Sequence, residues 1–183
     1  MGRDLSDGAA NAHAVVVGGS GMLAGLCRSL AADGRQVTVI GRDERKLRQA
    51  TAGAPRLHPV SVDYEDLPEF GAALAAAAAA RGPIVLAVCW IRSLAPAALR
   101  AAADAVAPGG RLVHVLGSRR SEASAATIAE LEGRDDLVYQ QVQLGAVGDA
   151  GRHRWLTDDE ISAGVYAAVR ASRPYYLVGT VAP

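Results

Sequence analysis

Four glycines lie close together between positions 18 and 25, directly after an apolar run. The run covers residues 13–17 and is typical of a buried strand, and Met22 opens a helical pattern. Residues 19–24 fit the spacing G-x-G-x-x-(G/A), while Gly18, Gly21 and Gly25 fit the looser G-x-x-G-x-x-x-G. A turn without side chains lets a pyrophosphate approach the backbone, and the first N–H groups of the helix face it. The sequence therefore predicts either a purely structural turn or, as we prefer, a dinucleotide site formed by Gly18, Gly19, Ser20, Gly21, Met22 and Leu23.

The predicted second strand ends at Ile40 and is followed by Gly41, Arg42 and Asp43. Dinucleotide-binding folds hold a ribose 2′-hydroxyl at this point with an acidic residue, or a 2′-phosphate with an arginine. Arg42 therefore favours NADP over NAD as the cofactor. Asp43 either reaches a ribose or caps the helix that follows. Asp63, after the third strand, either accepts a hydrogen bond from the adenine amino group or caps the next helix.

The fourth and fifth strands end in residues that we predict near the reacting part of the cofactor. Trp90 and Arg92 follow the fourth strand, and we expect Trp90 to contact the cofactor and Arg92 the substrate. Gly117 and Ser118 follow the fifth strand, with Gly117 beside the cofactor and Ser118 facing the reacting carbon. Arg119 is either an anion clamp for a carboxylate substrate or part of a solvated turn.

Residues 145–155 are polar, rich in glycine and without periodicity, so they form either a lid over the cofactor or an ordinary surface loop. In the first case His153 is a candidate proton donor and Trp155 contacts the substrate. His114 lies inside the predicted fifth strand, and we interpret it as a core histidine rather than a general acid.

Strands and helices alternate along the whole chain, and the strands are nearly continuous apolar runs, which is typical of a parallel sheet covered on both faces. We predict a single-domain α/β, doubly wound Rossmann fold over residues 13–183, with a mainly parallel sheet in the order 3-2-1-4-5-6-7, after a disordered tail over residues 1–12. The predicted strands cover 13–17, 36–40, 57–62, 84–90, 112–116, 137–144 and 175–178. The predicted helices cover 21–32, 43–50, 67–80, 95–107 and 121–131, and a last long helix begins with a capping box of Thr157 and Glu160.

These residues resemble the short-chain dehydrogenase/reductase superfamily. GGSGMLAG is similar to its glycine-rich turn, Arg42 and Asp63 match its NADP-binding and adenine-binding positions, and Ser118 matches its catalytic serine. The segments GGSGMLAG, VIGRD, VCWIRS, HVLGS and RWLTDDEIS also resemble short proteins of this superfamily for which we know no settled activity.

The sequence departs from that family in two places. VCWI stands where the family has Asn-Asn-Ala-Gly, and none of the five tyrosines has a lysine four positions further on. Lys46 is the only lysine and lies in the cofactor half. Ser118 would therefore polarise a carbonyl without an evident proton source.

Composition limits the class of protein. The chain has 183 residues, half of them apolar, and a net charge of zero, so we expect one globular domain and no nucleic-acid partner. No apolar run reaches membrane-spanning length, and Cys27 and Cys89 fall in a helix and a buried strand, which suits a reducing cytoplasm. We expect a homo-oligomer, most simply a dimer, that acts on a small molecule without a metal.

The sequence supports two main hypotheses about function. The first is an NADP(H)-dependent reductase of a small carbonyl, imine or activated alkene, with the proton supplied by Ser118, His153 or water. The second is an NADP(H)-binding protein without net redox chemistry, either a nucleotide sensor or a cyclase or isomerase with a reshaped pocket. A scaffold that has lost its pocket is a third possibility, against which the intact glycine turn argues.

Overall fold

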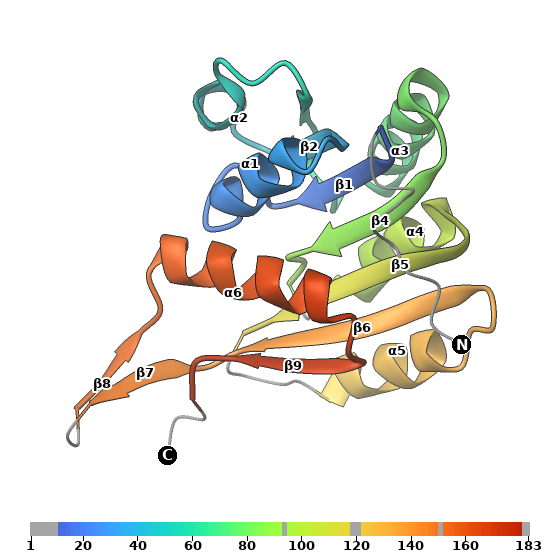
Figure 1. Ribbon diagram of the computed structural model, residues 1–183. Helices are drawn as coiled ribbons and strands as arrows, with labels where there is room; N and C mark the ends of the chain where they lie inside the picture. Colours follow the sequence, from blue (N-terminus) through green and yellow to red (C-terminus); the bar gives the residue numbers. More distant parts are fainter. Residues whose placement is uncertain (1–10, 93–94, 118–121, 150–151, 181–183) are drawn as a thin grey trace.

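The centre of the molecule is a seven-stranded parallel sheet in the order β3-β2-β1-β4-β5-β6-β9, as the computed structural model shows (Figure 1). The structure describes residues 11–92, 95–117, 122–149 and 152–180. The strands of this sheet are β1 (His13–Val17), β2 (Gln36–Gly41), β3 (Leu57–Ser61), β4 (Ile84–Cys89), β5 (Val106–Leu116), β6 (Leu137–Leu144) and β9 (Tyr175–Val178). The predicted Rossmann-type fold and strand order are confirmed, and β9 is the predicted seventh strand. The predicted tail falls almost wholly on residues 1–10, which lie outside the described residues.

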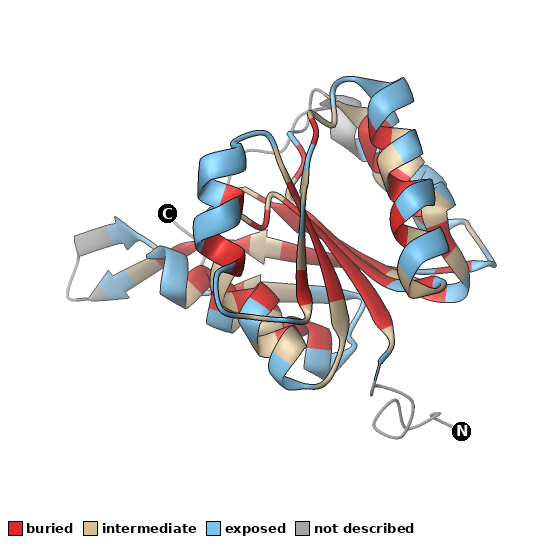
Figure 2. Ribbon diagram, turned by 90° about the horizontal axis from the view of Figure 1, so that it is seen from above, coloured by how far each residue is buried: buried red, intermediate tan, exposed pale blue. Residues whose placement is uncertain are grey.

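Helices cover both faces of the sheet, as the view from above shows (Figure 2). One face packs against α1 (Ala24–Ala32), α2 (Glu44–Thr51) and α6 (Asp158–Ala171), and the other against α3 (Leu67–Arg81), α4 (Pro96–Ala105) and α5 (Glu122–Glu132). All five residues of β1 are buried, because side chains on either side of a central strand meet a helix layer. Both predicted cysteine positions are confirmed, since Cys27 in α1 and Cys89 in β4 are buried.

Two helix starts were correctly predicted from capping residues. The Asp43 carboxylate accepts a hydrogen bond from the backbone N–H of Lys46 at 2.9 Å and so caps α2. Thr157 and Glu160 form the predicted capping box at the start of α6. Both caps satisfy backbone donors that the first turn of a helix leaves without a partner.

The segment between α4 and β5 differs from the prediction. We predicted a helix to residue 107 and a strand from 112, but α4 ends at Ala105 and β5 begins at Val106. The Pro-Gly-Gly sequence lies within the strand, where the pairing of β4 with β5 shifts register. Gly109 has a φ of +77°, a backbone conformation that glycine adopts without strain, so these glycines allow an irregular strand rather than ending a helix.

The aperiodic segment at 145–155 has regular structure that the sequence did not predict. It makes an antiparallel pair, β7 (Ala146–Asp149) and β8 (Arg152–Trp155), that projects beyond the carboxyl end of β6 (Figure 1). Each strand has only four residues, β7 with a glycine and an aspartate and β8 with two arginines and a histidine, so no apolar alternation marked the pair in the sequence.

Candidate functional site

The glycine turn between β1 and α1 has one buried side and one open side. The helix begins at Ala24 rather than at Gly21 as predicted, so residues 18–23 form an extended turn. A β-carbon placed on Gly19 would lie 2.8 Å from Cγ1 of Val39 and 2.9 Å from Sγ of Cys27, so Gly19 is needed for packing. A β-carbon on Gly21 would meet nothing within 4 Å, and Gly21 is exposed. The open side of the turn therefore has room for a ligand to approach the backbone.

Helix α6 holds this turn from behind. The hydroxyl of Ser162 donates a hydrogen bond to the carbonyl of Met22 at 2.7 Å. A β-carbon on Gly25 would lie 2.9 Å from Cβ of Ser162, so α1 and α6 approach each other closely at this point. Sequence reasoning missed Ser162, because a small residue on a helix carries no signal that a contact depends on it.

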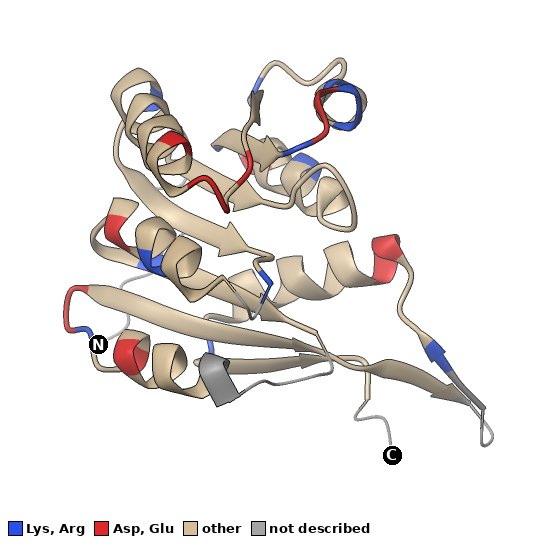
Figure 3. Cartoon of the chain, turned by 180° about the vertical axis from the view of Figure 1, so that it is seen from behind, with Lys and Arg blue, Asp and Glu red and all other residues tan. Residues whose placement is uncertain are grey.

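Arg42 lies at the carboxyl end of β2 with 58% of its side chain exposed. Its Nη1 is 3.5 Å from Oδ2 of Asp63, so the two residues predicted to bind the adenosine part of the cofactor lie together. The guanidinium has five N–H donors, and this single ion pair leaves room for an anion. Figure 3 shows basic and acidic residues close together around α2 and its neighbouring loops.

The two aspartates near Arg42 have different local roles. Asp43 is committed to the cap of α2, and its bond from Lys46 lowers the pKa of the carboxyl group. Asp63 accepts a hydrogen bond from the backbone N–H of Glu65 at 3.0 Å, while Asp66 caps α3. Of the two alternatives for Asp63, the helix cap is therefore wrong, because the chain makes a further turn before α3 begins at its cap Asp66.

The indole of Trp90 lies across the carboxyl ends of three neighbouring strands. A β-carbon on Gly18, after β1, would lie 3.2 Å from Cβ and 3.4 Å from Cδ1 of Trp90. A β-carbon on Gly117, after β5, would lie 3.3 Å from Cη2 of the same indole. The structure thus brings Gly18, Trp90 and Gly117 together, as expected for residues around one site.

The end of β5 is fixed by a side chain that the sequence analysis did not single out. The amide of Gln143 in β6 donates hydrogen bonds to the carbonyl oxygens of Gly117 and Leu116. Gln143 is one of three glutamines in β6, so its residue type alone does not distinguish it. Ser118 and Arg119 lie outside the described residues.

A shallow hollow lies between α4 and α5, beside the carboxyl ends of β4 and β5. It is lined by Ile91, Arg92, Ala95, Pro96, Leu99, His114 and Thr127. His114 is 3% exposed, its Nδ1 is 2.8 Å from the hydroxyl of Tyr139, and burial lowers its pKa to about 4. His114 is therefore neutral at pH 7, and its predicted place in the core is confirmed.

The hairpin holds the remaining candidates. The side chain of Trp155 is exposed, and Arg154 forms an ion pair with Glu160 at 2.7 Å, which ties β8 to the start of α6. The backbone of His153 pairs with Gly148, and its side chain lies outside the described part of the chain. Among the described residues, the side chain that lies against Gly18 and Gly117 is that of Trp90, not that of Trp155.

Among the residues that the structure describes, no helix is long and apolar enough to cross a membrane. The same residues contain no group of three or more His, Cys, Asp or Glu that would hold a metal ion.

Comparison with known proteins places the fold but not the family. No protein-family model and no curated protein sequence matches this chain. Solved structures of short-chain dehydrogenases do match. A short-chain dehydrogenase from Burkholderia cenocepacia in complex with NADP has a TM-score of 0.73 at 18% identity, and the match covers 94% of this chain and 98% of that one. A short-chain dehydrogenase/reductase from Serratia marcescens has a TM-score of 0.72 at 18% identity, covering 94% and 99%. One from Streptomyces avermitilis has a TM-score of 0.71 at 15% identity, covering 92% and 88%.

The chain therefore has the fold of short-chain dehydrogenase structures. Its residues fit the adenosine and diphosphate part of a nicotinamide cofactor, because the turn is open at Gly21 and Arg42 stands at the end of β2. The Trp90 indole lies next to this part of the site, at the carboxyl ends of β4 and β5.

Proposed function

We propose that this protein binds NADP(H) at the glycine turn and acts as an oxidoreductase of the short-chain dehydrogenase type. The observation that carries the proposal is the pairing of an open backbone turn after β1 with an exposed guanidinium after β2. In a doubly wound sheet these two ends lie side by side, since Val17 pairs with Ile40. The turn would hold the diphosphate, and Arg42 would hold the 2′-phosphate that distinguishes NADP from NAD.

The bound cofactor would supply hydride, and the chain would orient the reactants and deliver a proton. We propose a small carbonyl, imine or activated alkene as substrate, with Arg92, Arg119 and Trp155 as its contacts. Ser118 or His153 would supply the proton, or water would. Imines and activated alkenes suit this chain because it has no Tyr-x-x-x-Lys pair to protonate an alkoxide.

The same sequence feature supports a second candidate, an NADP(H)-binding protein without net redox chemistry. Such a protein would be a nucleotide sensor, or a cyclase or isomerase that uses the pocket for another reaction. The absence of a Tyr-x-x-x-Lys pair favours it, because hydride transfer to an ordinary ketone needs an acid at that place.

Calorimetry with NADPH and NADH tests the cofactor. We expect NADPH to bind more tightly, and Arg42→Ala to weaken NADPH about tenfold or more while leaving NADH nearly unchanged, because a charged hydrogen bond to the 2′-phosphate is lost. Arg45→Ala, an exposed arginine on α2, is the matched control. Equal affinity for both nucleotides, or no binding of either, would refute the proposal.

Turnover separates the two candidates. The loss of nicotinamide absorbance from NADPH is followed with a panel of carbonyls, imines and activated alkenes. Oxidation with any substrate class supports the reductase, whereas tight binding without oxidation across the panel supports the non-redox protein.

A further inference from the structure

The Trp90 indole lies along a strip of the molecule that runs from Gly18, at the end of β1, to Gly117, at the end of β5. Its five-membered ring lies near Gly18 and its six-membered ring near Gly117, so the indole spans from the end of β1 to the end of β5. Both flanking positions are glycines, and the backbone N–H of Trp90 bonds to the carbonyl of Val17 at 3.1 Å. The indole is half-buried and packs against the cluster of apolar side chains below α1 and α6.

A dinucleotide held at the glycine turn has to cross the same strip. Ligands of doubly wound sheets bind outside the carboxyl ends of the strands, at the point where the strand order reverses between β1 and β4. The adenosine end lies over β2 and β3, where Arg42 and Asp63 stand. The other half must therefore run over β4 and β5, in the direction that the indole takes.

We propose that Trp90 determines how much of the nucleotide the site accepts. A 2′-phosphorylated adenosine fits with the indole in place, while the nicotinamide half enters only after the indole has moved away. This inference rests on the proposed function and adds to it the group that controls entry to the reactive half of the site.

Movement of the indole costs binding energy. The contacts of Trp90 with the apolar cluster are lost when the side chain moves away, so the open state is the less populated one. The observed affinity for the full dinucleotide is then the affinity of the open state multiplied by the fraction of molecules in that state. The adenosine fragment does not require this change, so its affinity is independent of the side chain at position 90.

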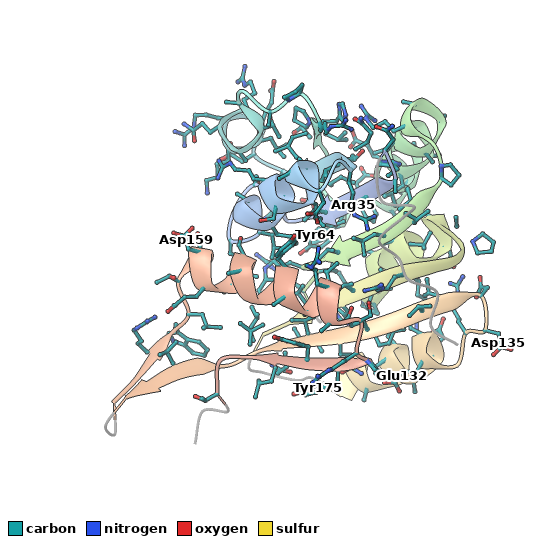
Figure 4. The ribbon with its side chains drawn as sticks, in the orientation of Figure 1. Arg35, Tyr64, Glu132, Asp135, Asp159 and Tyr175 are labelled. Carbon is teal, nitrogen blue, oxygen red and sulfur yellow. The ribbon has the colours of Figure 1, made fainter. Side chains whose placement is uncertain are left out.

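The test compares two ligands by calorimetry, NADP⁺ and adenosine 2′,5′-bisphosphate, with wild type and Trp90→Ala. We expect wild type to bind the two ligands with similar affinity, within about threefold. Trp90→Ala should bind NADP⁺ about tenfold more tightly than wild type and the bisphosphate unchanged. Tyr175→Ala is the matched control, because it removes an exposed aromatic ring from the start of β9, at the opposite end of the sheet (Figure 4).

Fluorescence reports the movement itself. In a Trp155→Phe background Trp90 is the only indole, since the chain has two tryptophans. NADP⁺ should shift the emission of Trp90 to longer wavelength as the ring enters water, and the bisphosphate should leave it unchanged. If Trp90→Ala does not fold, Trp90→Leu replaces it in the binding test. A circular dichroism melt shows whether each variant is folded.

Each other outcome overturns the inference in a distinct way. Weaker binding of NADP⁺ to Trp90→Ala, with the bisphosphate unchanged, would mean that the indole is a stacking surface for the ligand. An unchanged ratio of the two affinities would mean that the indole is not in the path. Failure of both ligands to bind wild type and variant would refute the proposed function, and the inference with it.

Discussion

The two halves of the sheet end in opposite ways at the edge where a ligand would bind. In the first half, β1 and β2 end in an open glycine turn and an exposed arginine. In the second half, β4 and β5 end beneath the Trp90 indole, and Gln143 bonds to the carbonyl of Gly117. The first half leaves the backbone at Gly21 available to an outside molecule, whereas the Trp90 indole lies over the end of the second half and reaches back to Gly18. A shared fold therefore does not imply that the whole binding strip is equally accessible.

The largest expected effect distinguishes the two sides of the turn in the first half. Gly19→Leu should lower the free energy of unfolding by about 3 kcal/mol, because its side chain would enter the space of Val39 and Cys27. Gly21→Leu should change it by less than about 0.5 kcal/mol, since the position is open, but should weaken nucleotide binding. Urea unfolding and calorimetry measure the two effects. A similar loss of stability in both variants would contradict this division of the turn.

The next effect concerns the buried histidine of the second half. Burial lowers the pKa of His114 to about 4, below its ordinary value of 6.5, so the unfolded chain binds more protons between these values. Stability is therefore complete above about pH 6.5 and falls as the pH drops toward 4, by up to about 3 kcal/mol. His114→Gln should remove that part of the pH dependence in urea unfolding curves measured from about pH 4 to pH 7.

His13 in the first half is the internal comparison for His114. Burial also lowers its pKa, but its hydrogen bond with the Gly82 carbonyl acts in the opposite direction. We expect His13→Gln to remove a smaller part of the pH dependence than His114→Gln does. A larger effect at His13 would show that the first half, rather than the second, limits stability in acid.

A smaller effect is expected at the helix that supports the glycine turn. Thr157→Ala removes the side-chain cap of α6 and should cost about 1 kcal/mol of unfolding free energy. Thr157→Ser keeps the hydroxyl and should restore most of it. No loss in Thr157→Ala would mean that the Arg154–Glu160 ion pair already holds the start of the helix.

The smallest effect is expected at the ion pair between Arg42 and Asp63. Both side chains are more than a third exposed, so Asp63→Ala should change the free energy of unfolding by less than about 0.5 kcal/mol. The same variant should weaken nucleotide binding if Asp63 contacts the adenine. Thermal unfolding with and without NADPH measures both quantities, and unchanged affinity would assign Asp63 only to its local turn.

The sequence was sufficient for the fold because its signals are repeated. The central strands β1 and β4 are apolar runs, and some helices begin at a capping residue, such as Asp43 for α2 and Thr157 for α6. Errors occurred where one residue type serves two structures. The glycines at 109 and 110 stand inside β5, although glycine after proline more often ends a helix.

Much less of the candidate site was predictable. Gly18, Trp90 and Gly117 were expected near one another because parallel strands end at one edge, and their contacts confirm this. The direction of the indole depends on χ angles and on the space left by two glycines far apart in the chain, which no local pattern encodes. Gln143 and Ser162 act through contacts with distant carbonyl oxygens, so their sequence neighbours do not reveal them.

The bond from Ser162 to the Met22 carbonyl joins residues 140 positions apart in the chain. Contacts of such long range form late in folding, because a large loop must close before they contribute. During synthesis, when a chain emerges from its amino terminus, the glycine turn would exist for most of that time without its support. The glycine turn thus gains its contact with Ser162 only after α6 has been made, 140 positions further along the chain.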